Sequence, residues 1–325
     1  MKHLKNPIFF ILIIPFLFLD CKKNDAGPAG SVDVFVAGNI VASNGNTVAA
    51  YWKNGSLVKL SDSTISSGAN GIAVNGNDIY VAGFVKDQSN NFYPAYWKNG
   101  NLTKLAGGSS GAWANSILIS GSDIYICGWS NGHAFYWKNG NSVQLNNDPQ
   151  LSAAYGIAVV GNDIYVVGES ENNMATIWKN GSAAFLAGNN INSSAVSIAS
   201  NGSDIYVSGS IEGNAVYWKN GVATNLMEGT SGYAANGIAF SGSDIYISGN
   251  FGSDIGAFWK NGQISKLSNG TTCSGIASNG NDIYLVGYQI ASNNIISATY
   301  WKNGNATTLG TNSQASAICF GSKTQ

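Results

Sequence analysis

Arginine is absent from this chain of 325 residues, and charged residues of all kinds make up only 10% of it. The formal net charge at pH 7 is −1. A protein that binds a nucleic-acid backbone needs a stripe of basic side chains to neutralise the phosphates. The sequence offers no such stripe, so we exclude nucleic acid as a partner.

Histidine is scarce as well, since only His3 and His133 occur and His3 belongs to the amino-terminal leader. One His outside the leader cannot build a His-rich metal site. The chain also lacks the G-x-S-x-G and H-E-x-x-H motifs, a phosphate-binding loop and a calcium loop with fixed ligand spacing. We therefore expect no metal and no cofactor.

Long hydrophobic runs are missing too, apart from Ile8–Leu19, which Pro15 interrupts. This run follows Lys2 and Lys5 and is too short for a membrane-spanning helix, which needs about 20 residues. Its length and its basic flank suit the core of a signal peptide. We assign residues 1–20 to that signal peptide.

Cys21 stands directly after the hydrophobic run and is followed by the polar segment Lys22–Asp25. This arrangement resembles the lipobox of bacterial lipoproteins, in which the Cys becomes the acylated first residue of the mature protein. The resemblance implies a lipid on Cys21 and a tether over residues 21–30. Asp20 departs from the lipobox, which prefers a small residue there, and the alternative is a plain secretory signal cleaved nearby. We expect an exported protein of the cell envelope, at the outer membrane or cell surface, or otherwise a secreted one.

The dominant feature of the remaining chain is a repeat. The tetrapeptide Trp-Lys-Asn-Gly occurs seven times, and successive Trp residues are 45, 40, 41, 40, 41 and 42 residues apart. This spacing is typical of β-propellers, whose blades have four strands each. The repeated Trp residues are Trp52, Trp97, Trp137, Trp178, Trp218, Trp259 and Trp301.

Each repeat predicts four short strands, as the second full unit illustrates. Apolar, β-branched and aromatic residues favour strands near Gly71–Val74, at Asp78–Ala82, near Ala95–Lys98 and at Leu102–Leu105. Asn99-Gly100 separates the last two strands, and Asn-Gly is the strongest signal for a two-residue hairpin turn. No segment of the mature chain has a 3.6-residue apolar period long enough for a core helix, so we predict an all-β fold.

The phase of the repeat predicts how the ring closes. The chain enters at the second strand of a unit, because Gly27 stands where the first-strand Ile belongs. It leaves after a lone first strand, Ala317–Phe320. Joining the two ends completes a seven-bladed β-propeller over residues 31–325, in which a C-terminal inner strand joins the N-terminal blade. The first strands are rich in Gly, Ala and Ser, so we place them at the central channel, and we expect a monomer.

Three Cys residues lie within this domain. Cys127 is several repeats away from the others, so a three-Cys framework is not expected. Cys273 and Cys319 belong to neighbouring blades, and a disulfide between them is the alternative to buried free thiols, which we favour.

The charged residues divide into a regular set and an irregular one. An Asp opens the second strand of every unit, antiparallel to a strand that ends in the repeated Lys. We predict a ring of Asp–Lys or Asp–turn contacts with a structural role. The repeated Asp residues are Asp33, Asp78, Asp123, Asp163, Asp204, Asp244 and Asp282.

Eight further acidic residues are predicted to lie in loops after second or fourth strands, which emerge on one face of the disc because strand direction alternates. They are Asp62, Asp87, Asp148, Glu169, Glu171, Glu212, Glu228 and Asp254. An irregular, acidic face on a rigid scaffold is a typical place for function. The alternative is that these carboxylates only keep a protein of low charge soluble.

Unusual residues gather on this face in the third and fourth blades. Aromatic rings beside carboxylates suit a neutral sugar or a cationic group, so we predict a ligand site there. The alternative for the two Trp residues is that they fill the channel mouth or a blade junction. The candidates are Trp113, Trp129, His133, Tyr155, Glu169 and Glu171.

The Tyr-Trp-Lys-Asn-Gly and Gly-(Asn/Ser)-Asp-Ile-Tyr repeats, over residues 33–320, resemble those of secreted bacterial β-propeller lipoproteins. The resemblance implies a tethered protein of the cell envelope. We expect a non-enzymatic binding or interaction module whose partner is a glycan or an envelope protein, with the lipid as its only membrane contact. The alternative is a carbohydrate-active enzyme, in which Glu169 and Glu171 would act as acid and base.

Overall fold

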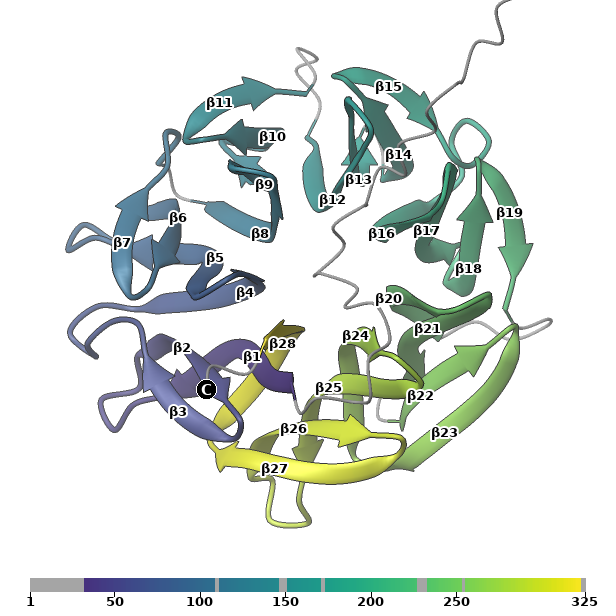
Figure 1. Ribbon diagram of the computed structural model, residues 1–325. Coiled ribbons are helices and arrows are strands. Elements are labelled where there is room, and N and C mark those ends of the chain that lie inside the picture. The colour runs from purple at the N-terminus through teal and green to yellow at the C-terminus, as the bar shows by residue number, and fades with distance from the viewer. Residues whose placement is uncertain are drawn as a thin grey trace, which may run out of the picture.

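The computed structural model describes residues 32–108, 111–145, 151–170, 173–226, 233–252 and 255–322. These residues form seven antiparallel sheets of four strands each, arranged as blades around a central axis (Figure 1). The prediction of an all-β, seven-bladed propeller is confirmed. Within the described ranges, no helix is long and apolar enough to cross a membrane. The assigned signal peptide, the tether and Cys21 lie outside the described residues.

The strands are grouped here by their position in the blade, from the axis outward (Figure 1). The innermost, or first, strands are β28 (Ser313–Ser322), β4 (Ser67–Asn75), β8 (Ala112–Ser120), β12 (Ala153–Val160), β16 (Ser193–Asn201), β20 (Tyr233–Ser241) and β24 (Thr271–Asn279). The second strands are β1 (Val32–Val41), β5 (Asp78–Lys86), β9 (Asp123–Ser130), β13 (Asp163–Ser170), β17 (Asp204–Ile211), β21 (Asp244–Phe251) and β25 (Asp282–Ile290).

The third strands carry the repeated Trp and are β2 (Thr47–Lys53), β6 (Phe92–Lys98), β10 (His133–Lys138), β14 (Met174–Lys179), β18 (Asn214–Lys219), β22 (Ile255–Lys260) and β26 (Ile296–Lys302). The outer, or fourth, strands are β3 (Ser56–Lys59), β7 (Asn101–Lys104), β11 (Asn141–Gln144), β15 (Ser182–Phe185), β19 (Val222–Asn225), β23 (Gln263–Asn269) and β27 (Asn305–Thr311). We number the blades in chain order, so that blade 1 holds β28 and β1–β3, and blade 2 holds β4–β7.

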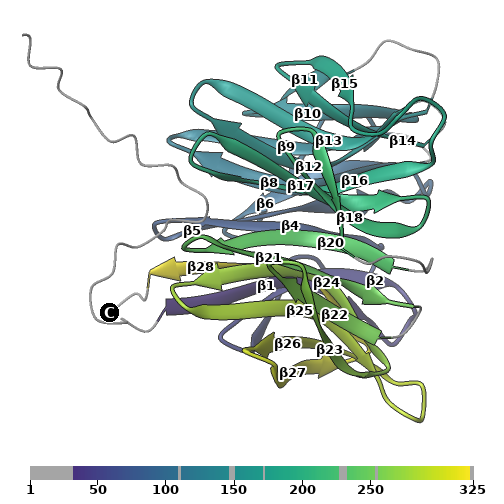
Figure 2. The same cartoon turned by 90° about the vertical axis from the view of Figure 1, so that its right-hand side faces the viewer.

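Blade 1 is built from both ends of the chain. Strand β28 pairs with β1 in antiparallel register, with Val34 opposite Phe320 and Val36 opposite Ile318. Figure 2 shows the start of β1 and the end of β28 on the same side of the disc. The predicted closure is therefore confirmed, and it pairs two edges that would otherwise be open.

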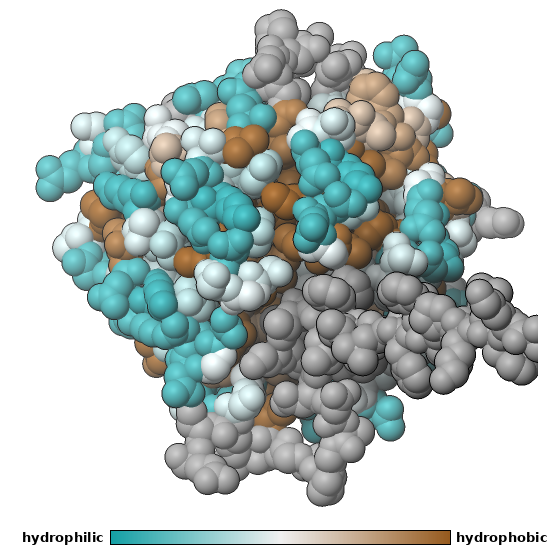
Figure 3. Space-filling model, turned by 45° about the horizontal axis from the view of Figure 1, so that its top comes forward, coloured by the Kyte–Doolittle hydropathy of each residue, from teal (hydrophilic) through white to brown (hydrophobic). Residues whose placement is uncertain are grey.

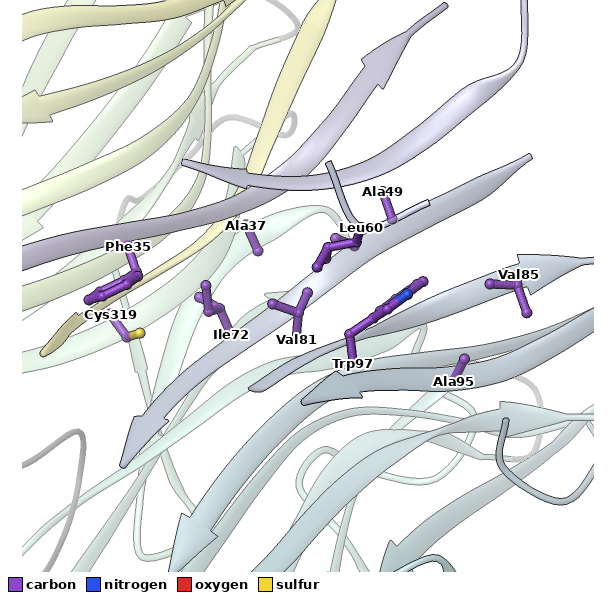
Figure 4. Packing of buried hydrophobic residues seen from close by; sticks show 11 residues of the cluster. Phe35, Ala37, Ala49, Leu60, Ile72, Val81, Val85, Ala95, Trp97 and Cys319 are labelled. Atoms are coloured by element: carbon purple, nitrogen blue, oxygen red, sulfur yellow. The ribbon is translucent and has the colours of Figure 1, made fainter. Parts of the chain in front are cut away.

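The hydrophobic core lies between neighbouring blades. Trp97 of blade 2 is 1% exposed and packs in one cluster with Ile72 and Val81 of its own blade and with Ala37 and Leu60 of blade 1 (Figure 4). The other repeated Trp residues are buried in the same way, at 2% exposure or less. Bulky indoles fill the space where blades diverge, while the crowded inner strands are rich in Gly, Ala and Ser.

The repeated Asp residues hold the chain's Asn-Gly turns. Each Asp forms an ion pair with the Lys of its own blade, with Nζ–Oδ2 distances of 2.7–2.9 Å. In blade 2 the second oxygen of Asp78 accepts the Nδ2 of Asn99, whose Oδ1 accepts the backbone N–H of Ile79. Asn99 has φ 50°, which Asn tolerates well. The predicted ring of Asp contacts is confirmed, and its role is structural.

The side of the disc that carries these turns also has hydrophobic surface. Viewed obliquely from the side of Figure 1, hydrophilic residues gather in separate blocks with hydrophobic residues between them (Figure 3). We call this side the turn face; it lies on the left in Figure 2, where β1 begins and β28 ends.

A second repeated contact joins neighbouring blades. A buried hydroxyl at the start of a first strand, or directly before it, accepts the N–H of the third strand in the preceding blade, at 2.8–3.1 Å. The donors are Ala49, Ala134, Ala175, Gly256 and Ala298, and their acceptors are Ser67, Ser152, Ser193, Thr271 and Ser313 respectively. In blade 2 the donor position holds Pro94, which has no N–H, and the acceptor position in blade 3 holds Ala112, which has no hydroxyl.

The three Cys residues of the propeller, Cys127, Cys273 and Cys319, are buried, and none of them forms a disulfide. The prediction of buried thiols is confirmed. Cys273 lies within strand β24. Burial raises the pKa of the Cys273 thiol to about 12, so it stays protonated and inert near neutral pH.

Candidate functional site

The loops that connect second to third strands, and fourth strands to the next blade, emerge opposite the turn face. We call this side the loop face. Of the eight irregular acidic residues, Asp62, Asp87, Glu169 and Glu212 lie in the described part of the chain, and the other four lie outside it. Glu169 is not in a loop as predicted but in strand β13, paired with Ala153 and Ala175.

Two of these carboxylates stabilise their own loops. Asp62 accepts the backbone N–H of Thr64 at 2.9 Å. Asp87 accepts the N–H groups of Ser89 and Asn91 at 2.8 and 2.9 Å. Hydrogen bonds to the ionised form lower the pKa of both carboxyls, with the Thr64 hydroxyl largest for Asp62 and the Asn91 N–H largest for Asp87. Some of the acidic residues on the loop face are therefore explained by their role in forming turns.

Trp113 and Trp129 form the centre of the candidate site. They lie directly opposite each other on β8 and β9, and their ring centroids are 4.7 Å apart at 35°. Trp113 also contacts two rings of blade 2, Phe84 at 5.9 Å and Phe92 at 5.0 Å. Phe84 and Phe92 are 5.4 Å apart. We call these four half-buried residues the aromatic cluster.

The aromatic cluster bridges blades 2 and 3 at the loop face. The junction-filling role considered for the two Trp residues therefore holds for Trp113, yet all four residues are only partly buried. Glycines make room for them. A Cβ atom on Gly68 would lie 2.3 Å from Phe84 Cε1, and one on Gly111 would lie 2.9 Å from the Trp129 ring. The rings of Phe84 and Trp129 can lie where they do because Gly68 and Gly111 have no side chain.

The scaffold does not require aromatic residues at these positions. Six residues after each repeated Asp stand Asn39, Phe84, Trp129, Glu169, Ser210, Asn250 and Tyr288. Asn39 and Asn250 use this position structurally, because their Oδ1 atoms accept the N–H groups of Ala69 and Cys273 in the next blade at 2.8 and 2.9 Å. Phe84 and Trp129 cannot accept such a bond. Blades 2 and 3 thus have a half-buried aromatic side chain where blades 1 and 6 have a structural amide.

Tyr155 occupies a β-bulge. The pairing of β12 with β13 shifts between Ala154 and Gly156, which leaves Tyr155 as the extra residue. At the same bulge in blades 2 and 3, Asn70 and Asn115 donate Nδ2 to a carbonyl of the next blade, at 3.0 and 2.8 Å. Bulges often re-aim a side chain near functional sites.

The Tyr155 hydroxyl instead donates to Glu169 Oε2, at 3.3 Å within its own blade. Burial, followed by the charge of Glu169, raises the pKa of Tyr155 well above its usual value. The phenol therefore stays a donor, and one Glu169 oxygen is engaged by it.

The sequence-predicted residues thus form two pairs, Trp113 with Trp129 and Tyr155 with Glu169. His133 begins β10 opposite Ser130, and within the described residues its buried Nδ1 has no hydrogen-bond partner. Glu171 lies outside the described residues. Among the residues that the structure places, no group of three or more His, Cys, Asp or Glu side chains is arranged to hold a metal ion.

The sequence analysis missed Phe84, Phe92 and Lys86. Lys86 lies opposite Phe92 across β5 and β6, and its Nζ lies 4.6 Å from the centroid of that ring. Phe84 had a signal in the sequence, because it shares the position of Trp129 relative to the repeated Asp. Phe92 had none, since its contact with Trp113 joins two blades.

The fold and this surface define a seven-bladed β-propeller with an aromatic cluster on its loop face. No protein-family model matches the sequence, and no curated protein matches it. Among solved structures, a puromycin-hydrolyzing peptidase of Mycobacterium tuberculosis is similar, with a TM-score of 0.58 and 11% identity over 87% of this chain. A putative 6-phosphogluconolactonase from Bacteroides fragilis has a TM-score of 0.49 and 14% identity, covering 91% of this chain and all of its own.

The chain spans about half of the peptidase, 52% of its length. Similarity at this level of identity concerns the propeller fold.

Proposed function

We propose that this protein is a non-enzymatic binding module of the cell envelope, exported by its leader, held by a lipid on Cys21, and specific for a glycan at its loop face. The aromatic cluster is the single observation that carries this proposal. Two of its residues, Phe84 and Trp129, stand where Asn39 and Asn250 make structural bonds in other blades, and all four residues of the cluster are only partly buried. Exposed apolar surface on a rigid scaffold is typical of binding sites.

A glycan fits this surface because sugar rings present apolar C–H faces that stack on aromatic rings, while their hydroxyls need polar partners. Trp129 and Trp113 supply adjacent ring surfaces on neighbouring strands. The Tyr155–Glu169 pair of blade 4 offers a carboxylate oxygen as an acceptor for sugar hydroxyls, since the tyrosine hydroxyl occupies only one of the two oxygens.

The test is binding of the purified full chain to a glycan array, followed by titration of each hit with Trp129→Ala and Tyr288→Ala. Tyr288 occupies the position of Trp129 in blade 7, so its variant is a matched control. Loss of a central Trp is expected to weaken binding at least about tenfold, whereas Tyr288→Ala leaves it unchanged.

Equal affinity in the two variants would overturn the site. Release of shortened product from a bound glycan would overturn the non-enzymatic part of the proposal. Mass spectrometry of the mature amino terminus checks the lipid separately, and an unacylated terminus would overturn the anchor.

A further inference from the structure

Lys86 is the charged group that adjoins the aromatic cluster. It is the last residue of β5, it is half-buried, and its ammonium lies over Phe92, the ring that contacts both Phe84 and Trp113. The seven repeated Lys residues all pair with an Asp of their own blade. Within the described residues Lys86 takes part in no ion pair, so its positive charge has no carboxylate partner there.

The neighbouring carboxylate does not neutralise Lys86 by direct contact, because Asp87 is occupied by its own loop. Its Oδ1 accepts two backbone N–H groups, and its Oδ2 accepts Nδ2 of Asn91 at 3.2 Å and the hydroxyl of Tyr93 at 3.2 Å. Asp62, in the loop between blades 1 and 2, is likewise held by Thr64. Both carboxylates therefore accept hydrogen bonds from groups close to them in the chain.

An ammonium beside an aromatic platform has a definite preference. It repels a cationic ligand, and it gains little from a neutral one. A carboxylate on a stacked sugar ring would form a charge-assisted hydrogen bond with it. Such bonds are stronger than neutral ones, and the adjacent aromatic surface limits the access of water to them.

From this geometry we infer that the glycan bound at the aromatic cluster is acidic, with a sugar carboxylate paired to Lys86. The inference rests on the proposed function. It specifies the glycan as one of uronic-acid type, in place of the neutral or cationic ligand that the sequence indicates. Trp113 and Trp129 bind the sugar ring, and Lys86 favours sugars that carry a carboxylate.

The experiment compares polygalacturonate with its fully methyl-esterified form, which has the same sugar rings without the charge. At low salt the native full chain is expected to bind the acid form about tenfold more tightly, as one charge-assisted bond allows. Lys86→Gln is expected to abolish this preference, because the affinity for the acid form falls to about that for the ester. High salt should reduce the preference of the native chain in the same way.

Lys266→Gln is the matched control, because Lys266 also lies over an aromatic ring, Phe251, at 3.1 Å, but in blade 6. It should retain the full preference for the acid form. If the native chain binds both polymers equally, or if Lys86→Gln keeps the preference, the inference is overturned while the proposed function stands. If neither polymer nor any array glycan binds, the proposed function fails and the inference fails with it.

Discussion

At the scale of single residues, the seven repeated Asp side chains make the same contacts in different surroundings. Six of them are 33–38% exposed, whereas Asp33 in blade 1 is only 5% exposed. Asp33 pairs with Lys53 at 2.9 Å and accepts Nδ2 of Asn54 at 2.8 Å. Water can replace a lost contact at an exposed site, but it cannot do so at a buried one.

Replacement of Asp33 should therefore lower the stability of the protein more than replacement of its counterparts. We expect Asp33→Ala to lower the free energy of unfolding by about 1–3 kcal/mol, because the Asn54 amide and the Lys53 ammonium lose a buried acceptor. Asp282→Ala, which removes the equivalent exposed carboxylate of blade 7, should cost clearly less. Urea unfolding of both variants measures the difference, and equal midpoints would show that burial of Asp33 has no energetic consequence.

At the scale of the strand, the hydroxyl contact between blades explains a local exception in the repeat. Pro94 of β6 has no N–H to be satisfied, and Ala112 of β8 has no hydroxyl to satisfy one. Each departure alone would leave a buried polar group without a partner, whereas the two together leave none. The pair therefore behaves as one unit across the boundary between blades 2 and 3.

This reasoning predicts non-additive effects at the boundary. Pro94→Ala should destabilise the protein by about 1–3 kcal/mol, because the new N–H is buried opposite Ala112, and Ala112→Ser should destabilise it by burying an unpaired hydroxyl. The double variant should recover much of both losses in stability. It places an N–H at residue 94 opposite a hydroxyl at residue 112, which is the arrangement of Ala175 and Ser193, 2.9 Å apart. Thermal unfolding of the full double-mutant cycle measures the coupling. Strict additivity would contradict it.

The whole ring could be predicted from the sequence because its determinants recur. Trp97 and Asp78 each have six counterparts in the same chain, and comparison among them separates scaffold from exception without any relative. The candidate site could be predicted only in part. Trp113 and Trp129 stand out as Trp residues outside the repeat, and their pairing follows from neighbouring strands. Phe92 belongs to another blade, so its contact with Trp113 depends on how blades pack, which no local pattern encodes.

At the scale of the whole molecule, stability depends on the strand that the C-terminal end contributes to blade 1. A chain ended at residue 312 loses β28, and with it the buried side chains of Ala315 and Cys319 and the inner of the two strands that pair with β1. Blade 1 is then left with three strands, and an unpaired inner edge faces the axis. Exposed strand edges pair with other chains. We expect this variant to lose the cooperative unfolding of the intact chain and to self-associate, as measured by calorimetry and sedimentation.

The matched control ends at residue 322 and keeps all of β28, so it should unfold like the full chain. Adding a synthetic peptide of residues 313–325 to the shortened protein should restore a single cooperative transition, because β28 binds through backbone pairing that needs no covalent link to β27. A shortened chain that stays monomeric with an unchanged transition would mean that the other six blades hold the ring without it. Closure would then be a consequence of the packing between blades rather than its cause.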